Sequence, residues 1–194
     1  MNGFDLSTIS SVYVGSTQYS SIYYGSTLIW PTAPQPHDYS LDYFTIESLQ
    51  DSNTIKIAKA KSPANLSLSY STDDGSTWTD LTITGGRDFT TINTGDKIIF
   101  KGINNSFSNA WDSYYRFNAS KNFKVYGNAM SLLFGDNFTS NSEFASGTTC
   151  NLCGLFYGTT TLVDASNLIL PATTCTLSCY NGAFRGCTNL TTAP

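Results

Sequence analysis

The chain has 194 residues, of which 40% are hydrophobic and 12% charged, so it can bury a core while carrying about half the charge of an ordinary soluble domain. Charged helix formers are scarce, whereas Tyr and Phe number 12 each and favour strands. The composition therefore predicts an all-β fold and excludes a helical bundle. The net charge of −4 leaves no basic surface for phosphates, so we expect neither a nucleic-acid nor a membrane partner.

A short internal repeat marks the N-terminal segment, residues 1–39. Residues 12–17 (VYVGST) recur as residues 22–27 (IYYGST), and each copy predicts a strand that enters a glycine turn. The proline-rich residues 31–36 predict an extended linker. A segment this short cannot bury its own apolar side chains, so we expect a hairpin that docks on another chain. The residues expected to make this attachment are Val12, Tyr13, Val14, Ile22, Tyr23, Tyr24, Leu28, Ile29 and Trp30.

Short strands separated by turn residues follow in residues 40–128 and predict a β-sandwich of immunoglobulin-like size. Apolar and polar residues alternate most clearly in residues 54–58 and 66–70, so one face of each strand should be buried. The expected strands are residues 44–46, 54–58, 66–70, 78–81, 88–92, 97–102, 114–117 and 123–126.

One motif within this region fits the pattern S-x-D-x-G-x-T-W. It consists of Ser71, Asp73, Gly75, Thr77 and Trp78, and it resembles the Asp-box hairpins of sialidase propellers. Sialidases carry several such boxes and an arginine cluster, whereas this chain has one box and three scattered arginines. We therefore interpret the motif as a structural turn, in which the aspartate accepts hydrogen bonds from turn amides.

A group of aromatic residues lies near the polar turn that contains Asn104, Asn105 and Asn109. These side chains could stack on sugars or form one end of the sandwich core, and we expect them to belong to the core. The residues are Phe107, Trp111, Tyr114 and Tyr115.

The C-terminal region, residues 129–194, contains a second repeat with a displacement of 28 residues. A period in the twenties with apolar and small residues at fixed places predicts the start of a leucine-rich-repeat-like solenoid. Because the second copy ends close to Pro194, we expect further repeats to follow it. Phe156, Gly158, Leu162 and Ala165 recur as Phe184, Gly186, Leu190 and Ala193.

All five cysteines lie in this region, and an odd number does not suit a fully paired disulfide framework. Four of them could hold zinc as two pairs, but positions within the repeat favour packing as small apolar side chains. We expect reduced thiols, no metal and no cofactor. His37 is the only histidine, which leaves little material for catalysis, so we expect no enzyme. The cysteines are Cys150, Cys153, Cys175, Cys179 and Cys187.

Residues 162–171 (LVDASNLILP) and 183–190 (AFRGCTNL) together resemble the BspA-type leucine-rich repeat, which has an aromatic residue, Gly-Cys, and a leucine three residues on. The N-terminal repeat is similar to the leader of phage appendage proteins, including those of crAss-like gut phages. Cellular BspA-type proteins begin with an export signal, and the first residues here lack the positive charge and apolar stretch of one.

The resemblance implies a virion protein, made in the host cytoplasm, that serves as a fibre or as a capsid or tail decoration subunit. Its partners would be other virion proteins, sister subunits and a host-surface glycan or protein. The alternative is a carbohydrate-binding or adhesin module of a bacterial surface protein.

Overall fold

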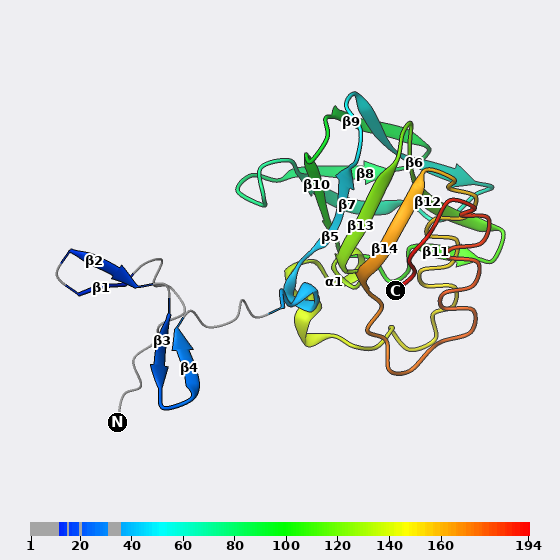
Figure 1. The fold of residues 1–194 in the computed structure, drawn as a ribbon. Coiled ribbons are helices and arrows are strands. Elements are labelled where there is room, and N and C mark those ends of the chain that lie inside the picture. Colours follow the sequence, from blue (N-terminus) through cyan, green and yellow to red (C-terminus); the bar gives the residue numbers. More distant parts are fainter. Residues whose placement is uncertain (1–11, 15, 20, 31–35) are drawn as a thin grey trace. The chain divides into compact units, whose positions relative to one another are not determined.

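The computed structural model describes residues 12–14, 16–19, 21–30 and 36–194. The chain divides into two compact units, residues 1–37 and 38–194, and each is described by itself (Figure 1).

The N-terminal unit contains two antiparallel hairpins rather than the one that the repeat predicts. β1 (Val12–Val14) pairs with β2 (Thr17–Tyr19), and β3 (Ile22–Tyr24) pairs with β4 (Thr27–Trp30). In the second hairpin Tyr24 lies opposite Thr27, which leaves a turn of two residues that begins with Gly25 at φ +62°. Glycine adopts this left-handed backbone at no steric cost, so the second sequence copy can turn back on itself.

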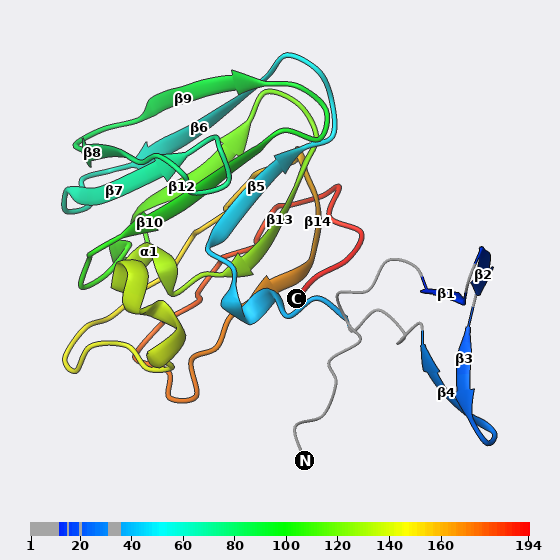
Figure 2. The same cartoon turned by 90° about the vertical axis from the view of Figure 1, so that its left-hand side faces the viewer.

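The second unit is a sandwich of a six-stranded and a four-stranded sheet (Figure 2). The larger sheet has the order β14-β13-β5-β10-β7-β8, and the smaller has the order β11-β12-β6-β9. The strands of the larger sheet are β5 (Phe44–Ser48), β7 (Leu66–Ser71), β8 (Thr79–Ile83), β10 (Lys97–Gly102), β13 (Phe123–Asn128) and β14 (Leu162–Ile169). The smaller sheet contains β6 (Asn53–Ala60), β9 (Arg87–Ile92), β11 (Ser108–Ala110) and β12 (Ser113–Ala119).

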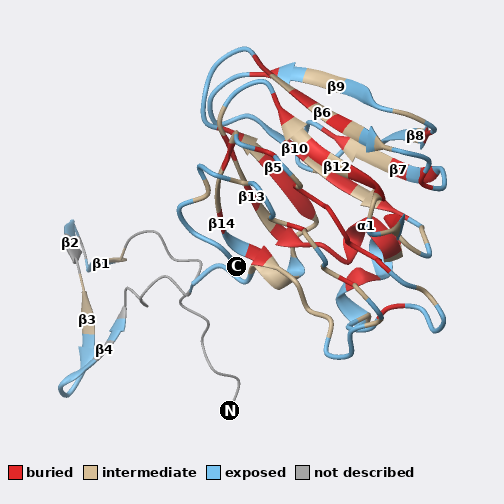
Figure 3. Cartoon of the chain, turned by 90° about the vertical axis from the view of Figure 1, so that its right-hand side faces the viewer, coloured by how far each residue is buried: buried red, intermediate tan, exposed pale blue. Residues whose placement is uncertain are grey.

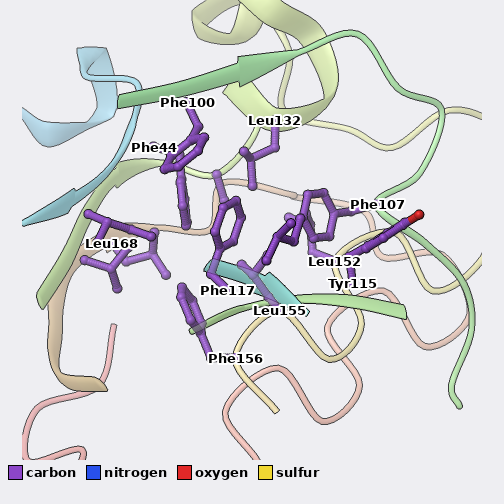
Figure 4. Packing of buried hydrophobic residues seen from close by; sticks show 14 of the residues in the cluster. Phe44, Phe100, Phe107, Tyr115, Phe117, Leu132, Leu152, Leu155, Phe156 and Leu168 are labelled. Carbon is purple, nitrogen blue, oxygen red and sulfur yellow. The ribbon is translucent and has the colours of Figure 1, made fainter. Parts of the chain in front are cut away.

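Aromatic rings join the two sheets. The ring centroid of Phe117, in the smaller sheet, lies 4.9 Å from those of both Phe44 and Phe100, in the larger sheet (Figure 4). In Figure 3, buried residues alternate with half-buried or exposed residues along several strands, as expected when one face of a strand lies against the core. The expected all-β fold is therefore confirmed. Every predicted strand of the sandwich is present, residues 97–102 with the predicted bounds and the others with at least one shifted end.

The C-terminal region packs into the same core instead of forming a separate body. β14 pairs in parallel with β13, and the ring of Phe156 stacks against Phe44 at 6.0 Å between centroids. The predicted boundary between residues 128 and 129 accordingly does not separate two compact units. β14 and the short β11 are not among the strands that the sequence predicts.

Three short helices complete this unit: η1 (Tyr39–Leu41), α1 (Ser131–Phe134) and η2 (Gly135–Ser140). The hydroxyl of Ser131 accepts a hydrogen bond from the amide of Phe44 and donates one to the carbonyl of Phe100, which fixes α1 to two strands of the larger sheet. Among the described residues, no helix is both long and apolar enough to cross a membrane.

Two coils of chain stack on each other beside the sandwich. We call residues 149–159 the first coil and residues 176–187 the second coil. Alternate amides of the first coil donate to carbonyls of the second, always between residues 27 positions apart and at N···O distances of 2.7–3.0 Å. The donors are Cys150, Leu152, Gly154, Phe156 and Gly158, and the acceptors are Leu177, Cys179, Asn181, Ala183 and Arg185.

Residues at equivalent positions of the 28-residue repeat are in contact between the two coils. The rings of Phe156 and Phe184 stack with centroids 5.6 Å apart, and Gly186 lies against Gly158. Two coils are present, whereas a solenoid is built from at least three repeats. The solenoid therefore stays a prediction.

The sandwich covers the other side of the first coil. The amides of Phe107 and Phe117 donate to the carbonyls of Asn151 and Leu155, at 2.7 and 2.9 Å. Side chains donate hydrogen bonds to three other carbonyls of the first coil. Ser106 Oγ donates to the carbonyl of Thr149, Ser108 Oγ to that of Cys153 and Arg116 Nη1 to that of Tyr157. With partners on both sides, residues 150–156 are all buried.

The second coil has a partner on one side only. In the described part of the chain, its outward amides donate to no backbone carbonyl, although they occupy the positions that donate in the first coil. Only Cys179 and Ala183 of this coil are buried. The outward amides belong to Ser178, Tyr180, Gly182, Phe184 and Gly186.

The contact between the first coil and β12 can be tested at Gly154. Gly154 has φ +68°, and a Cβ there would meet the ring of Tyr114 at 2.6 Å; Gly147 has φ +76° and open space around it. Alanine should cost about 1 kcal/mol at either position for its backbone, and a further ~1–3 kcal/mol at Gly154 for the collision. Urea unfolding of Gly154→Ala and Gly147→Ala measures this difference, and equal losses would contradict the packing.

Candidate functional site

Large side chains of the N-terminal hairpins are exposed. The side chains of Tyr13, Val14 and Tyr23 are 56%, 66% and 59% exposed, and that of Tyr24 is 83% exposed. Ile29 is 37% exposed, and Val12 and Ile22 are half-buried. The side chains of Leu28 and Trp30 lie outside the described residues. Exposed apolar side chains concentrated on so short a segment are typical of a binding surface.

The backbone of this unit also offers unpaired strand edges. β1 with β2 and β3 with β4 form separate two-stranded sheets, so among the described residues of this unit each strand has a hydrogen-bonding neighbour on one side only. Such edges add readily to the sheet of another chain, where backbone bonds give affinity and side chains give specificity. Residues 31–35 of the predicted linker lie outside the described part of the chain.

The Asp-box residues form the turn between β7 and β8. Asp73 Oδ1 accepts hydrogen bonds from Ser71 Oγ at 2.7 Å and from the amide of Thr77 at 2.9 Å, while Oδ2 accepts one from Thr77 Oγ1 at 2.7 Å. Gly75 takes φ +83° and its amide donates to Ser71 Oγ. All of these polar groups form hydrogen bonds within the turn itself, which is the geometry expected of a motif that stabilises the turn.

The last residue of the box connects the turn to the sheet. The ring of Trp78 lies 5.2 Å from that of Tyr43, and Lys101 Nζ sits 4.1 Å from the centroid of the indole. Lys101 also pairs with Asp136 at 2.8 Å, and this hydrogen bond, followed by that from Tyr43, lowers the pKa of the carboxyl. Trp78 is thus held by a cation and an aromatic ring rather than turned outward.

The aromatic group near the polar turn divides between core and surface. Phe107, Tyr114 and Tyr115 are buried, as expected for core residues. Trp111 is 69% exposed, so its expected place in the core is wrong. It lies between β11 and β12, where the tight connection turns its side chain outward.

The cysteines are all free thiols, and they differ in access to solvent. Cys175 is exposed, whereas Cys150, Cys153 and Cys179 are buried. Burial is the largest cause that raises the pKa of Cys153 to about 12 and that of Cys179 to about 11. Within the described ranges, no three or more histidine, cysteine or acidic side chains gather as metal ligands.

The Asp-box geometry predicts a specific dependence of stability on pH. Hydrogen bonds from Thr77, first its amide, and from Ser71 lower the pKa of Asp73 from 3.8 to about 2. The stabilising effect should be complete above pH 3.8 and fall as the pH drops toward 2. Asp73→Asn should lower the free energy of unfolding at pH 7 and flatten its decline across this window.

Denaturant unfolding at a series of pH values measures the effect. Asp74→Asn is the matched control, because its side chain is 80% exposed and its carboxylate lies 3.9 Å from the ammonium of Lys97. Parallel pH profiles for Asp73→Asn and the unmodified chain would refute the role given to this carboxylate.

Alkylation of the native protein should distinguish the thiols. Iodoacetamide at pH 8 should modify exposed Cys175 first and Cys153 at least about 100-fold more slowly, because burial suppresses its thiolate. Peptide mass spectrometry measures both rates, with denatured protein as the control in which all five react. Similar native rates for the two residues, or stoichiometric zinc on elemental analysis, would contradict this assignment.

Comparisons with known proteins supply no relative from which a function could be transferred. No family model, curated protein or solved structure matches this chain.

Proposed function

We propose that this chain is a non-enzymatic virion structural protein, a fibre or a capsid or tail decoration subunit, that is anchored by its N-terminal unit. The partners of that unit are other virion proteins or sister subunits. Residues 38–194 would act as the projecting body. This body would also contact a glycan or protein of the host surface.

The observation that carries the proposal is the contrast between the two units. Residues 38–194 have their own large core, whereas the N-terminal hairpins expose Tyr13, Val14, Tyr23 and Tyr24. A lone two-stranded hairpin is marginally stable in water. Pairing with a partner's sheet would both cover these side chains and bond the free strand edges.

The sequence resemblance to phage appendage proteins and BspA-type repeats supports the same function. The second candidate, an adhesin or carbohydrate-binding module of a bacterial surface protein, is favoured by the exposed Trp111. Quantitative mass spectrometry separates the two candidates, since the chain should copurify with phage particles in the first and with the cell envelope in the second.

The attachment role is tested by particle assembly with variants of the full chain. Tyr13→Ser combined with Tyr24→Ser should lower the copy number per particle by about tenfold or more, because anchor residues of interfaces are worth at least ~1.4 kcal/mol. Deletion of residues 1–37 should abolish incorporation. Quantitative mass spectrometry of purified particles provides the measurement.

Leu41→Ser combined with Leu177→Ser is the matched control, because these side chains in the second unit are 64% and 76% exposed. The control should be incorporated at the normal copy number. Normal incorporation of the deletion variant would show that the N-terminal unit is not the anchor.

A further inference from the structure

A small pocket lies where the connection between β11 and β12 meets the two coils. Its volume is about 190 Å³, and Trp111 and Asp112 line it from the strand connection. Tyr157 comes from the first coil, and Asn181 and Arg185 come from the second coil. Three segments that are separate in sequence therefore build one concave site. Its wall also includes the ring of Tyr114, which lies 5.5 Å from that of Tyr157.

The aromatic part of this pocket is open to solvent. Trp111 is 69% exposed, which is unusual for so large a side chain in a unit with an extensive aromatic core. The face of an aromatic ring is negative, so it attracts groups that carry partial positive charge. The C–H groups on one side of a sugar ring meet this requirement.

The polar part offers hydrogen-bond donors that the protein does not use. The side chains of Asn181 and Arg185 form no hydrogen bond or ion pair with any residue in the described ranges, and the Arg185 guanidinium lies 5.8 Å from the ring centroid of Tyr157. Asp112 differs, because its carboxylate pairs with Lys61. The unused donors are thus an amide and a cation.

The charge at the pocket is opposite in sign to that of the chain. The chain carries −4, but two of its three arginines meet here: Arg185 at the opening and Arg116 behind it, where Nη1 donates to the carbonyl of Tyr157 at 2.6 Å. Burial raises the pKa of Tyr114, and the charges of both arginines oppose that rise. With Asp112 balanced by Lys61, the site favours an anion.

We propose that this pocket binds a saccharide that carries a carboxylate group. The sugar ring lies on Trp111, the carboxylate pairs with the planar guanidinium of Arg185, and the Asn181 amide bonds a ring hydroxyl. The volume is below the ~300 Å³ of sites for drug-sized ligands, so one sugar ring enters and the rest of the saccharide extends into solvent. This site does not depend on the attachment role of the N-terminal unit.

Binding to the full chain can be measured by isothermal titration calorimetry with two acidic probes. These are 3′-sialyllactose and a tetrasaccharide of alternating glucuronic acid and N-acetylglucosamine, with lactose as the neutral counterpart. At least one acidic probe should bind about tenfold or more tightly than lactose, and added NaCl should weaken that binding.

Variants assign the binding to the pocket. Arg185→Gln and Trp111→Ala should each weaken acidic-probe binding by about tenfold or more. Arg87→Gln and Ile103→Ala are matched controls at exposed positions elsewhere on the same unit, and they should bind like the unmodified chain. Thermal unfolding of each variant confirms that it is folded.

Three results would overturn the proposal. The first is the absence of binding to both acidic probes at millimolar concentration. The second is binding of both acidic probes no tighter than that of lactose, which would remove the role of the carboxylate. The third is unchanged affinity in folded Arg185→Gln or Trp111→Ala. None of these results bears on particle incorporation, so failure here is distinguishable from failure of the attachment role.

Discussion

The second unit depends on the hydrogen bonding of the first coil, residues 149–159. This coil has the backbone of a turn-rich loop, and buried amides and carbonyls without partners would destabilise the fold. Its carbonyls accept hydrogen bonds from β12, from the amide of Phe107 and from side chains of the sandwich. Its alternate amides donate hydrogen bonds to carbonyls of the second coil. The irregular backbone can therefore be buried between the sandwich and the second coil.

This arrangement joins the sandwich and the C-terminal region into one body. Phe156 stacks on Phe44 of the sandwich and on Phe184 of the second coil, so a continuous line of rings crosses all three layers. β14 extends the larger sheet in the same region. The pocket at Trp111 exists only because these layers are held together, since its wall takes residues from each of them.

The elements that could be predicted from the sequence are those with a regular local pattern of residues. Alternation with a period of two marked β6 and β7, and the 28-residue displacement marked the like residues Phe156 and Phe184. Pairing partners are not recorded locally, and this is why β14 was read as part of a repeat instead of a strand beside β13. The same limit applies to the two N-terminal hairpins: a strand followed by Gly25 can pair either with the other copy or with the residues just after the turn.

The attachment surface and the pocket differ in how far the sequence reveals them. Exposed aromatic residues of the N-terminal unit were predictable, because a segment of fewer than 40 residues has no core to bury them. The pocket was not, because Trp111, Tyr157 and Arg185 meet only after the chain has wound into stacked coils. Composition even suggested the opposite for Trp111, since aromatic residues near β-strands are usually buried.

The outward surface of the second coil carries backbone hydrogen-bond donors of one kind. Its outward backbone offers N–H groups from Ser178 to Gly186 and no matching row of carbonyls. Two copies of the protein that met through this surface would bring donors against donors, and neither row could satisfy the other. Symmetric pairing through backbone bonds is thus disfavoured at this surface, because the arrangement of the backbone donors itself works against self-association there.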